Sequence, residues 1–404
     1  MQTIFFKIFG CKVNQLELET IRDSYVAKNV KVTDKLEDAE VVIIGSCTVT
    51  HTAESKLVKF ARKALRVNDK SKLIIVGCWL PEIKSRLAEF ADRIDFVDNE
   101  SKFTDLNTHN PNTVRISSKT RSFIKIQEGC NSFCSYCIIP YMRSTLHSRS
   151  ISDAIREVKK NIDAGAREIV LVGIHLGLWR EIEYRLHNLL EKLIQINGEW
   201  RLRLTSLEVH EITPELISLL SASNKLVEHL HISLQSGSTK VLKRMNRNYS
   251  KEYFLEKIAQ IRQKLPLAGI STDIIVGFPG ETDADHADTL DVIEKSKFMR
   301  VHVFPFSARK GTKAYDYDDK IHPGIIKHRE KQIMQTALEC KVKFTKAFVG
   351  KNVEILTEEN KPEGVIGYTR EYLPARIISP KKPNLNEFYY GNVKSVDNDG
   401  TLIL

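Results

Sequence analysis

Over the first hundred residues, short apolar runs alternate with amphipathic stretches of helical length. The runs at 3–8, 41–44 and 73–76 are typical of strands, and the stretches at 15–28 and 52–65 are typical of helices. Strands that are separated by helices return to the same edge of a sheet and lie parallel to one another. The pattern therefore predicts a small parallel α/β domain.

From about residue 121 the alternation continues with more units. Six apolar runs predict strands at 122–127, 168–172, 201–206, 229–234, 269–276 and 301–306, and helical stretches lie between them at 152–164, 184–196, 251–264 and 284–295. Six such units in about 200 residues suit a partial (β/α)6 barrel better than a closed barrel of eight. In this kind of fold, functional side chains gather at the carboxyl ends of the strands.

After residue 345 the pattern changes to short β-type runs broken by Gly, Pro and Asn-Asp-Gly, at 353–356, 364–369, 375–378, 389–393 and 402–404. These runs predict a small antiparallel β-barrel. Small barrels often bind nucleic acid through stacking aromatic side chains. The candidates for stacking here are Tyr368, Tyr372, Phe388, Tyr389 and Tyr390. A platform for RNA and a packing module are both open interpretations.

The expected fold class is therefore α/β multidomain. It has an N-terminal parallel α/β domain at 1–110, a central partial barrel at 116–345 and a C-terminal antiparallel barrel at 346–404. No window reaches about 18 uninterrupted apolar residues, and the N-terminus has no basic segment followed by a long apolar one. We expect a soluble cytoplasmic protein without a membrane partner.

Charge changes this picture only in the middle of the chain. The formal net charge is +10; residues 1–110 hold 17 cations against 16 anions and residues 346–404 hold 8 against 8, which leaves an excess of +9 in the central region. A polyanionic partner is one interpretation of that excess, and a solvated basic face is the other.

Seven cysteines in 404 residues are too few for a disulfide framework and indicate reduced thiols that could bind metal. Three of them, Cys11, Cys47 and Cys78, each follow one of the first three predicted strands. Because the carboxyl ends of parallel strands share an edge, the three thiols could meet there. Three unrelated buried thiols are the alternative.

Three further cysteines form a C-x3-C-x2-C run at Cys130, Cys134 and Cys137. Three thiolates without a fourth leave a coordination position open, whereas a closed structural zinc site takes four ligands. Zinc remains the alternative for this run. An iron–sulfur cluster with one accessible iron could bind an amine and a carboxylate of a ligand and donate one electron to it.

The same run, with Tyr136 before its last thiol, resembles the signature of radical S-adenosylmethionine enzymes. Together with the N-terminal three-cysteine domain and a C-terminal barrel of the TRAM type, it makes essentially the whole chain similar to the methylthiotransferase family. Residues 10–15, Gly-Cys-Lys-Val-Asn-Gln, resemble the subgroup that acts on N6-threonylcarbamoyladenosine. Further similar blocks lie at 204–208, 229–238, 243–247, 273–281 and 302–307.

The resemblance implies two [4Fe–4S] clusters and S-adenosyl-L-methionine as cofactors. The cluster on Cys130, Cys134 and Cys137 would generate a 5′-deoxyadenosyl radical, and the cluster on Cys11, Cys47 and Cys78 would supply the sulfur, with no side chain needed as nucleophile. The implied partners are a tRNA anticodon stem-loop, an external electron donor and a sulfur donor, and no DNA.

Candidate contacts to the cofactor come from Tyr136 and from the barrel strands. The strand residues are Gly173, Ser206, Glu208, Gln235 and Asp273. For Glu208 and Asp273, a carboxylate satisfied by a neighbouring cation is the alternative. His175, His229 and His231 could assist, although histidines inside apolar strands are usually hydrogen-bonded core residues.

Candidate contacts to RNA phosphates are basic residues near the expected barrel mouth: Arg143, Arg149, Lys243, Arg244 and Arg247. The seventh cysteine, Cys340, has no partner at motif spacing and is expected to be a structural thiol. Two other functions stay open. One is methylthio transfer to an aspartate of a ribosomal protein, and the other is a non-catalytic iron–sulfur protein that binds RNA.

Overall fold

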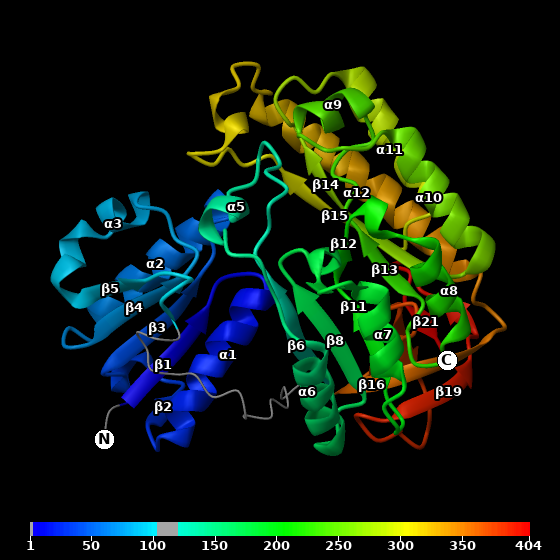
Figure 1. Ribbon diagram of the computed structural model, residues 1–404, viewed down its shortest axis with the longest axis horizontal. Coiled ribbons are helices and arrows are strands. Elements are labelled where there is room, and N and C mark those ends of the chain that lie inside the picture. Colours follow the sequence, from blue (N-terminus) through cyan, green and yellow to red (C-terminus); the bar gives the residue numbers. More distant parts are fainter. Residues whose placement is uncertain (1–2, 103–119) are drawn as a thin grey trace. The chain divides into compact units, whose positions relative to one another are not determined.

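The computed structural model describes residues 3–102 and 120–404, which form two compact units (Figure 1). Of the described residues, the first unit holds 3–102, 128–146 and 307–312, and the second holds 120–127, 147–306 and 313–404. Two short segments from the expected barrel region therefore belong to the N-terminal unit. One of them contains the C-x3-C-x2-C run.

The first unit is built on a five-stranded parallel sheet with the order β2-β1-β3-β4-β5. The three predicted strands are confirmed as β1 (Thr3–Ile8), β3 (Val41–Ser46) and β4 (Lys72–Gly77), and they are neighbours at the centre. The edge strands, β2 (Lys31–Thr33) and β5 (Ile94–Val97), were not predicted. Both are short, and their alternation of buried and exposed residues covers too few positions to give a signal.

Two long helices of this unit, α1 (Lys12–Ala27) and α2 (His51–Val67), pack on opposite faces of the sheet. Side chains of β3 alternate between them, because Ile43 packs in the cluster of α1 whereas Val42 and Ile44 pack in the cluster of α2. The shorter helical elements are η1 (Leu36–Asp38), α3 (Glu82–Arg86), η2 (Ala88–Arg93) and α5 (Ile139–Met142).

Two curved sheets form the barrel of the second unit, with the orders β11-β8-β6-β7 and β12-β13-β14-β15. The strand pairs β6–β8, β8–β11, β12–β13, β13–β14 and β14–β15 are parallel, whereas β9 and β10 form an antiparallel hairpin. The six predicted strands are confirmed, the third of them in two pieces: β6 (Arg121–Glu128), β8 (Glu168–Gly173), β11 (Arg201–Leu204) with β12 (Ser206–Leu207), β13 (His229–Ile232), β14 (Gly269–Val276) and β15 (Arg300–Pro305).

Helices cover the outside of these sheets (Figure 1): α6 (Ile151–Asp163), α7 (Leu186–Ile194), α8 (Pro214–Ala222), α9 (Thr239–Arg244), α10 (Lys251–Lys264), α11 (Asp283–Ser296) and α12 (Pro323–Lys346). The helix predicted at 184–196 starts later, because β9 (Arg180–Glu181) and β10 (Tyr184–Arg185) pair as a small hairpin. Short elements complete the unit: β7 (His147–Ser148), η3 (Leu176–Leu178), η4 (Val209–Glu211) and η5 (Lys313–Asp316).

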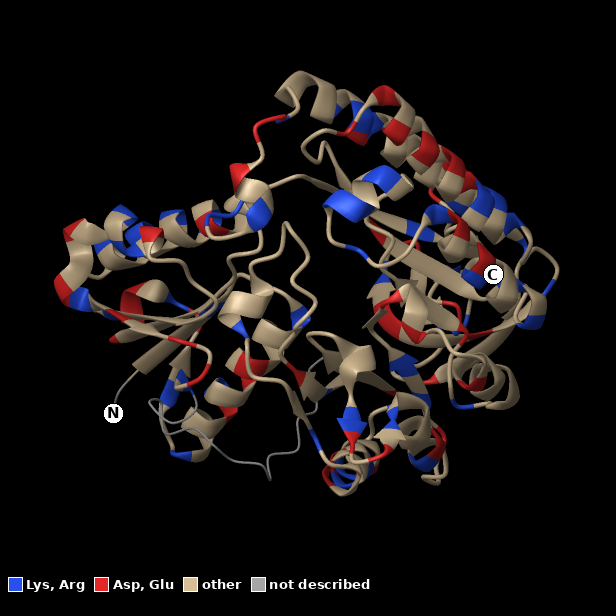
Figure 2. Cartoon of the chain, turned by 45° about the horizontal axis from the view of Figure 1, so that its top comes forward, with Lys and Arg blue, Asp and Glu red and all other residues tan. Residues whose placement is uncertain are grey.

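Lys and Arg are interspersed with Asp and Glu along the outer helices of this unit (Figure 2). The central excess of positive charge therefore does not by itself identify a binding face. Within the described residues, no helix has both the length and the apolar character of a membrane span.

The C-terminal segment forms a six-stranded sheet with the order β19-β16-β17-β18-β21-β20. Its strands are β16 (Asn352–Lys361), β17 (Gly364–Thr369), β18 (Pro374–Ile377), β19 (Phe388–Asn392), β20 (Ser395–Val396) and β21 (Leu402–Ile403). All pairings are antiparallel except that of β18 with β21, which is parallel. The expected antiparallel sheet is thus present with one parallel exception.

The aromatic side chains of this sheet pack mainly on arginines of the barrel strands. The guanidinium of Arg121 lies 4.7 Å from the ring centroid of Tyr368, and those of Arg203 and Arg201 lie 4.4 Å from Tyr372 and 5.6 Å from Phe388. Three of the five stacking candidates are thus engaged within the unit, which favours the packing role for them. Tyr390 is 58% exposed and remains available.

A buried carboxylate organises these arginines. Glu168 is fully buried, and its oxygens lie 2.8 Å from Arg121 Nε, 2.6 Å from Arg201 Nε and 2.9 Å from Arg203 Nε. Burial by itself raises the pKa of Glu168, but the charges of Arg203, Arg201 and Arg121 outweigh it and hold the pKa well below its usual range. The base of the barrel therefore contains a permanent anion.

Replacing Glu168 by glutamine is expected to lower the free energy of unfolding of the second unit by about 3–5 kcal/mol, because it leaves buried guanidinium groups without their shared counter-charge. Chemical denaturation at pH 7 measures the loss. Glu199→Gln is the matched control, since Glu199 is 65% exposed in its ion pair with Arg167 and should cost less than about 1 kcal/mol.

The charge of Glu168 also makes the stability of the protein depend on pH. A carboxyl whose folded pKa is depressed stabilises the protein above the pKa of the unfolded chain, about 4.3 for glutamate, and loses this contribution as the pH falls through the folded pKa. The unsubstituted protein should therefore lose stability on acidification below about pH 4, and Glu168→Gln should lose less over that range. An equal acid dependence in both proteins would contradict the assignment.

Candidate metal centres and cofactor site

Three cysteines lie at the carboxyl end of the N-terminal sheet. Cys47 and Cys78 directly follow β3 and β4, and Cys11 caps the start of α1 just after β1. The three strands are parallel neighbours, and the thiols are close enough for Cys11 and Cys78 each to act on the charge of Cys47. The predicted convergence at one edge is present, and the role of these thiols as ligands stays a prediction.

Burial makes two of these thiols, Cys11 and Cys47, poor anions on their own. It raises the pKa of Cys47 to about 11 and also raises the pKa of Cys11, and the neighbouring thiols add to both shifts. A positive group at this edge of the sheet therefore favours the thiolate forms of Cys11 and Cys47. This donor set fits a [4Fe–4S] cluster that is held by three thiolates and keeps one iron accessible.

The second set of thiols lies in the loop after β6 and comprises Cys130, Cys134 and Cys137. Gly129 has φ +78°, and a Cβ atom there would lie 2.2 Å from the carbonyl oxygen of Thr145, so only glycine fits. Phe133 is also left-handed, with φ +45°. Two residues with left-handed backbone within five positions make this loop turn tightly. A tight loop of this kind can bring its three thiols around one cluster.

Arg143 connects the two sets of cysteines within the first unit. Its carbonyl oxygen accepts a hydrogen bond from the backbone N–H of Cys130 at 3.3 Å, and its Nε lies 3.4 Å from Sγ of Cys78. Asn99 makes a parallel link, because its Nδ2 lies 3.2 Å from Sγ of Cys78 and 3.1 Å from the carbonyl oxygen of Met142. The two cysteine sets thus share one hydrogen-bonded framework.

The guanidinium of Arg143 is itself held by three partners. Its nitrogens lie 2.8 and 3.0 Å from the carboxylate of Glu17, 2.5 Å from Oδ1 of Asn14 and 2.7 Å from Glu128. Burial opposes the charge of Arg143, but Glu17 more than compensates, so its pKa lies well above the usual value. A fixed positive charge therefore faces the thiol of Cys78.

Asn14, Glu17 and Asn99 were not identified from the sequence. The signal for the first two is their spacing from Cys11, which precedes α1. Residues 14 and 17 lie on one face of the helix, and a buried Asn and Glu at such positions are unusual for packing alone. Asn99 follows β5, whose short run gave no prediction. Lys102 completes the group, with Nζ 2.7 Å from Glu17.

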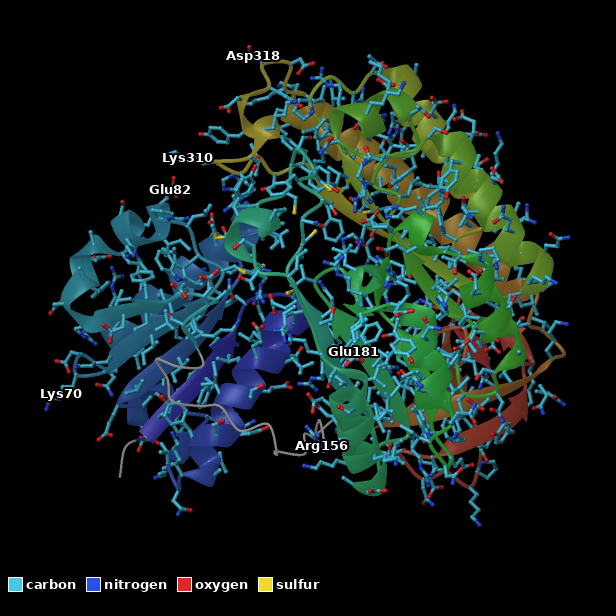
Figure 3. All side chains as sticks on the ribbon, viewed as in Figure 1. Lys70, Glu82, Arg156, Glu181, Lys310 and Asp318 are labelled. Carbon is cyan, nitrogen blue, oxygen red and sulfur yellow. The ribbon has the colours of Figure 1, made fainter. Side chains whose placement is uncertain are left out.

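A second buried arginine, Arg309, lies beside Cys47. It is 2% exposed, pairs with Glu54 and donates to Oγ1 of Thr48 at 3.0 Å, and Thr48 directly follows Cys47. Its neighbour Lys310 is instead at the surface, 3.2 Å from Glu82 (Figure 3). The segment 307–312 thus brings a second cation to the same edge of the sheet.

The expected cofactor residues of the barrel lie at or near the carboxyl ends of its strands. Gly173 ends β8, where a Cβ atom would lie 3.0 Å from the side chain of Gln127, and Ser206 is exposed on β12. Gln235 is left-handed, with φ +66°, and its N–H donates to the carbonyl oxygen of Asp273 at 2.8 Å. Tyr136 of the first unit is half-buried.

Two of these residues have partners in the protein. Glu208 accepts two bonds from Arg247, at 3.0 and 2.5 Å, which matches the alternative of a carboxylate satisfied by a cation. Asp273 lies within β14, three residues before its end, and its Oδ2 is 3.1 Å from Nε2 of His231. His175 likewise pairs with Glu211, at 2.7 Å.

Of the five basic residues expected to contact phosphate, two are buried and three are accessible to solvent. Arg143 and Arg247 are only 3% and 8% exposed and are held in the internal pairs described above, which favours an internal role over a phosphate contact. Arg149 pairs with Glu157, and Arg244 pairs with Asp319 at 2.8 Å. Lys243 is exposed. Only the last three have the access to solvent that a phosphate contact needs.

Two family models match the chain: "Radical SAM superfamily" over residues 124–293 and "Uncharacterized protein family UPF0004" over residues 3–98. Among solved structures, the radical S-adenosylmethionine methyltransferase TsrM from Kitasatospora setae aligns with a TM-score of 0.54 at 12% identity, over 76% of this chain and 75% of that one. At this identity the likeness shows the fold alone.

Relatives of known name match over nearly the whole chain. The threonylcarbamoyladenosine tRNA methylthiotransferases MtaB of Bacillus subtilis and Chlamydia pneumoniae are 33% and 36% identical, over 92% and 89% of this chain and 90% and 88% of theirs. The tRNA-2-methylthio-N(6)-dimethylallyladenosine synthase of Moorella thermoacetica is 30% identical, over 90% of both chains. This chain therefore belongs to the methylthiotransferase family of radical S-adenosylmethionine enzymes.

Proposed function

We propose that this chain is a tRNA methylthiotransferase that adds a methylthio group to C2 of N6-threonylcarbamoyladenosine beside the anticodon. The observation that carries the proposal is the pair of three-cysteine sets in one compact unit, linked through Arg143. The two relatives at 33% and 36% identity bear the name of that substrate. The sequence at 10–15, which includes Cys11 and the buried Asn14, resembles the same subgroup.

The residues of each set fit a cluster. Each provides three sulfurs, and the one other cysteine of the chain, Cys340, lies on α12 of the second unit. When bound, the two [4Fe–4S] clusters and S-adenosyl-L-methionine supply the radical and the sulfur for the transfer. Arg143 and Asn99 hold Cys78 in place, and the turn at Gly129 presents the other three thiols.

For the cofactor itself we propose contacts from Tyr136, Gly173, Ser206 and Gln235. Gly173 ends β8 and has no side chain of its own to keep a ligand away from its backbone. Glu208 is held rigidly by Arg247, so we propose that this pair positions the strand end next to Ser206. Asp273 has a different role, described below.

We assign the C-terminal sheet to the TRAM type and the substrate to the anticodon stem-loop of tRNA. Arg149, Lys243 and Arg244 are the proposed phosphate contacts, and Tyr390 is the proposed stacking residue of the C-terminal sheet. An external electron donor and a sulfur donor complete the reaction, which we place in the cytoplasm. We propose no contact with DNA or with a membrane.

Mass spectrometry of tRNA nucleosides from cells with and without this gene tests the proposal. Loss of methylthio-threonylcarbamoyladenosine, restored by the intact gene but not by a Cys134→Ala variant, is the expected result. Unchanged levels would overturn it. Loss of the methylthio-isopentenyl nucleoside would assign the substrate named for the Moorella relative, and loss of a methylthio group from a ribosomal protein would assign the protein substrate.

Replacing Lys243 by alanine should weaken tRNA binding equally for all tRNA sequences and reduce the salt dependence of binding by about one counterion. The slope of log affinity against log salt concentration measures this. Arg156→Ala is the control, because Arg156 pairs with Asp153 on the outer helix α6 and should leave the slope unchanged. A Lys243 variant with the original slope would exclude a phosphate contact there.

A further inference from the structure

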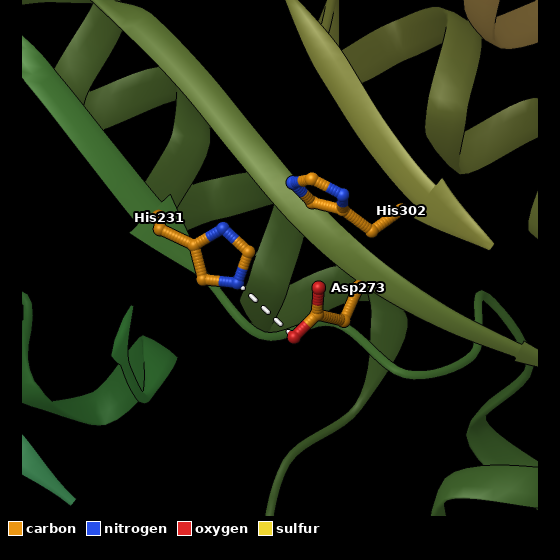
Figure 4. Close-up of side chains that lie close together, drawn as sticks. All are labelled: His231, Asp273 and His302. Carbon is orange, nitrogen blue, oxygen red and sulfur yellow. Dashed lines mark ion pairs between the residues drawn. The ribbon is translucent and has the colours of Figure 1, made fainter. Parts of the chain in front are cut away.

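Three side chains that can bind metal meet inside the second unit (Figure 4). His231, Asp273 and His302 come from the neighbouring strands β13, β14 and β15, and each offers a ligand atom within 4.8 Å of the other two. Asp273 and His302 are partners in the register of β14 and β15, and His231 Nε2 lies 3.1 Å from Asp273 Oδ2. The site is built on three strands and not on loops.

A second layer of hydrogen bonds orients the first of these ligands. Nδ1 of His231 lies 3.0 Å from Oγ of Ser271, and the same oxygen lies 3.1 Å from Nε2 of His229. The Ser271 hydroxyl has one proton, so it can accept from His231 and donate to His229. With a metal ion on Nε2 of His231, that arrangement places the ring proton on Nδ1; without the ion, Nε2 donates to Asp273 across the 3.1 Å contact. Histidines that bind metal are usually fixed in this way.

We propose that His231, Asp273 and His302 bind one divalent metal ion. Two imidazoles and one carboxylate suit Mn²⁺, Fe²⁺ or Zn²⁺ better than Mg²⁺ or Ca²⁺, which prefer oxygen ligands alone. Three protein ligands leave the remaining coordination positions to water or to oxygen atoms of a bound molecule. Nothing in the chemistry of the six cysteines requires this ion, so the proposal is independent of the proposed function.

The spacing and exposure of the three residues are compatible with an ion. Ligand atoms at about 2.1 Å from one metal are about 3.0 Å apart at right angles and at most about 4.2 Å apart, so the 3.1 Å pair fits as it stands. The ligand atom of His302 lies within 4.8 Å of the other two and must move closer to them. The rings of His231 and His302 have centroids 5.8 Å apart, which a small rotation of either ring can shorten. Asp273 is 27% exposed and His231 13%, so an ion can enter from solvent.

The competing explanation is an ion pair between His231 and Asp273 without a metal ion. The two explanations differ in whether His302 takes part. A simple pair needs no third residue, whereas a metal site loses most of its affinity when any one ligand is removed. The metal site also has a consequence for Asp273. A carboxylate that binds the metal would not be available to hydrogen-bond the ribose or adenine of the cofactor.

Titration of the intact protein with Mn²⁺ tests the proposal, with both clusters loaded, in their oxidised state and without an affinity tag. Mn²⁺ binds weakly to thiolates and can be followed by electron paramagnetic resonance. We expect one Mn²⁺ per chain, with spin-echo modulation from two imidazole nitrogens, and release of this Mn²⁺ by Zn²⁺. Absence of a bound ion with nitrogen coupling would overturn the proposal.

Three variants and a control complete the experiment. His302→Gln and Asp273→Asn should lower the affinity for Mn²⁺ by at least about 100-fold, and His229→Gln, which alters only the second layer, by about 10-fold. His147→Gln removes an exposed histidine and should change nothing. If Asp273→Asn weakened binding of S-adenosylmethionine but not of Mn²⁺, Asp273 would be a cofactor contact and the metal site would be excluded.

Discussion

Replacing Cys78 by alanine is expected to abolish methylthio transfer to tRNA while 5′-deoxyadenosine is still produced from S-adenosylmethionine. The variant loses one of three sulfur ligands at the edge of the N-terminal sheet, so the cluster there should not assemble. The loop after β6, with its own three thiols, is unchanged. Iron analysis should show a fall from about eight to about four atoms per chain.

Two further substitutions make this prediction specific. Cys134→Ala should also hold about four irons but should produce no 5′-deoxyadenosine, because it removes the other set. Cys340→Ala should keep about eight irons and both activities, since this thiol lies on α12 with Sγ 3.8 Å from the carbonyl oxygen of Ile293. Eight irons in the Cys78 variant would contradict the two-cluster assignment.

Replacing Arg143 by alanine should destabilise the first unit by about 3–5 kcal/mol, because the buried carboxylate of Glu17 then loses one of its counter-charges. The loop after the second cysteine set also loses its link to Cys78. We expect a lower denaturant midpoint, measured by the loss of cluster absorbance together with circular dichroism. Faster loss of iron in air should accompany it.

Two control variants separate the effect of the charge of Arg143 from the effect of its burial. Arg143→Lys keeps the charge but not the planar fork and should recover part of the stability. Lys310→Ala removes an exposed cation of the same unit, 70% accessible in its pair with Glu82, and should cost less than about 1 kcal/mol. If Arg143→Ala and Lys310→Ala unfolded at the same denaturant concentration, the buried pair would have no structural role.

The parts of the fold that depend on long periodic patterns were predictable from the sequence. The six barrel strands and the three central strands of the N-terminal sheet have runs of apolar residues long enough to read, and parallel pairing then places Cys11, Cys47 and Cys78 on one edge. The edge strands β2 and β5 were too short for such a pattern.

The surroundings of the cysteines were not predictable, because they depend on pairs that are distant in sequence. From the sequence alone, a basic residue after a cysteine motif is expected to lie at the surface. Only the fold shows that Arg143 hydrogen-bonds to Glu17 and Asn14, which lie 126 and 129 positions earlier in the chain. Arg247 and Glu208 are a similar case. In both cases a buried partner decides the role, and a single sequence does not contain the pairing.

The first unit is assembled from three stretches of chain, of which 128–146 and 307–312 lie beyond the apparent domain boundary. A gene fragment that stops at residue 110 would encode the sheet and its three thiols without Arg143 and Arg309, and Glu17 and Glu54 would lose these counter-charges. Swapping the N-terminal region between relatives to change substrate preference therefore requires all three stretches to be exchanged together. Both cysteine sets therefore belong to one folding unit that a cut at the apparent domain boundary would divide.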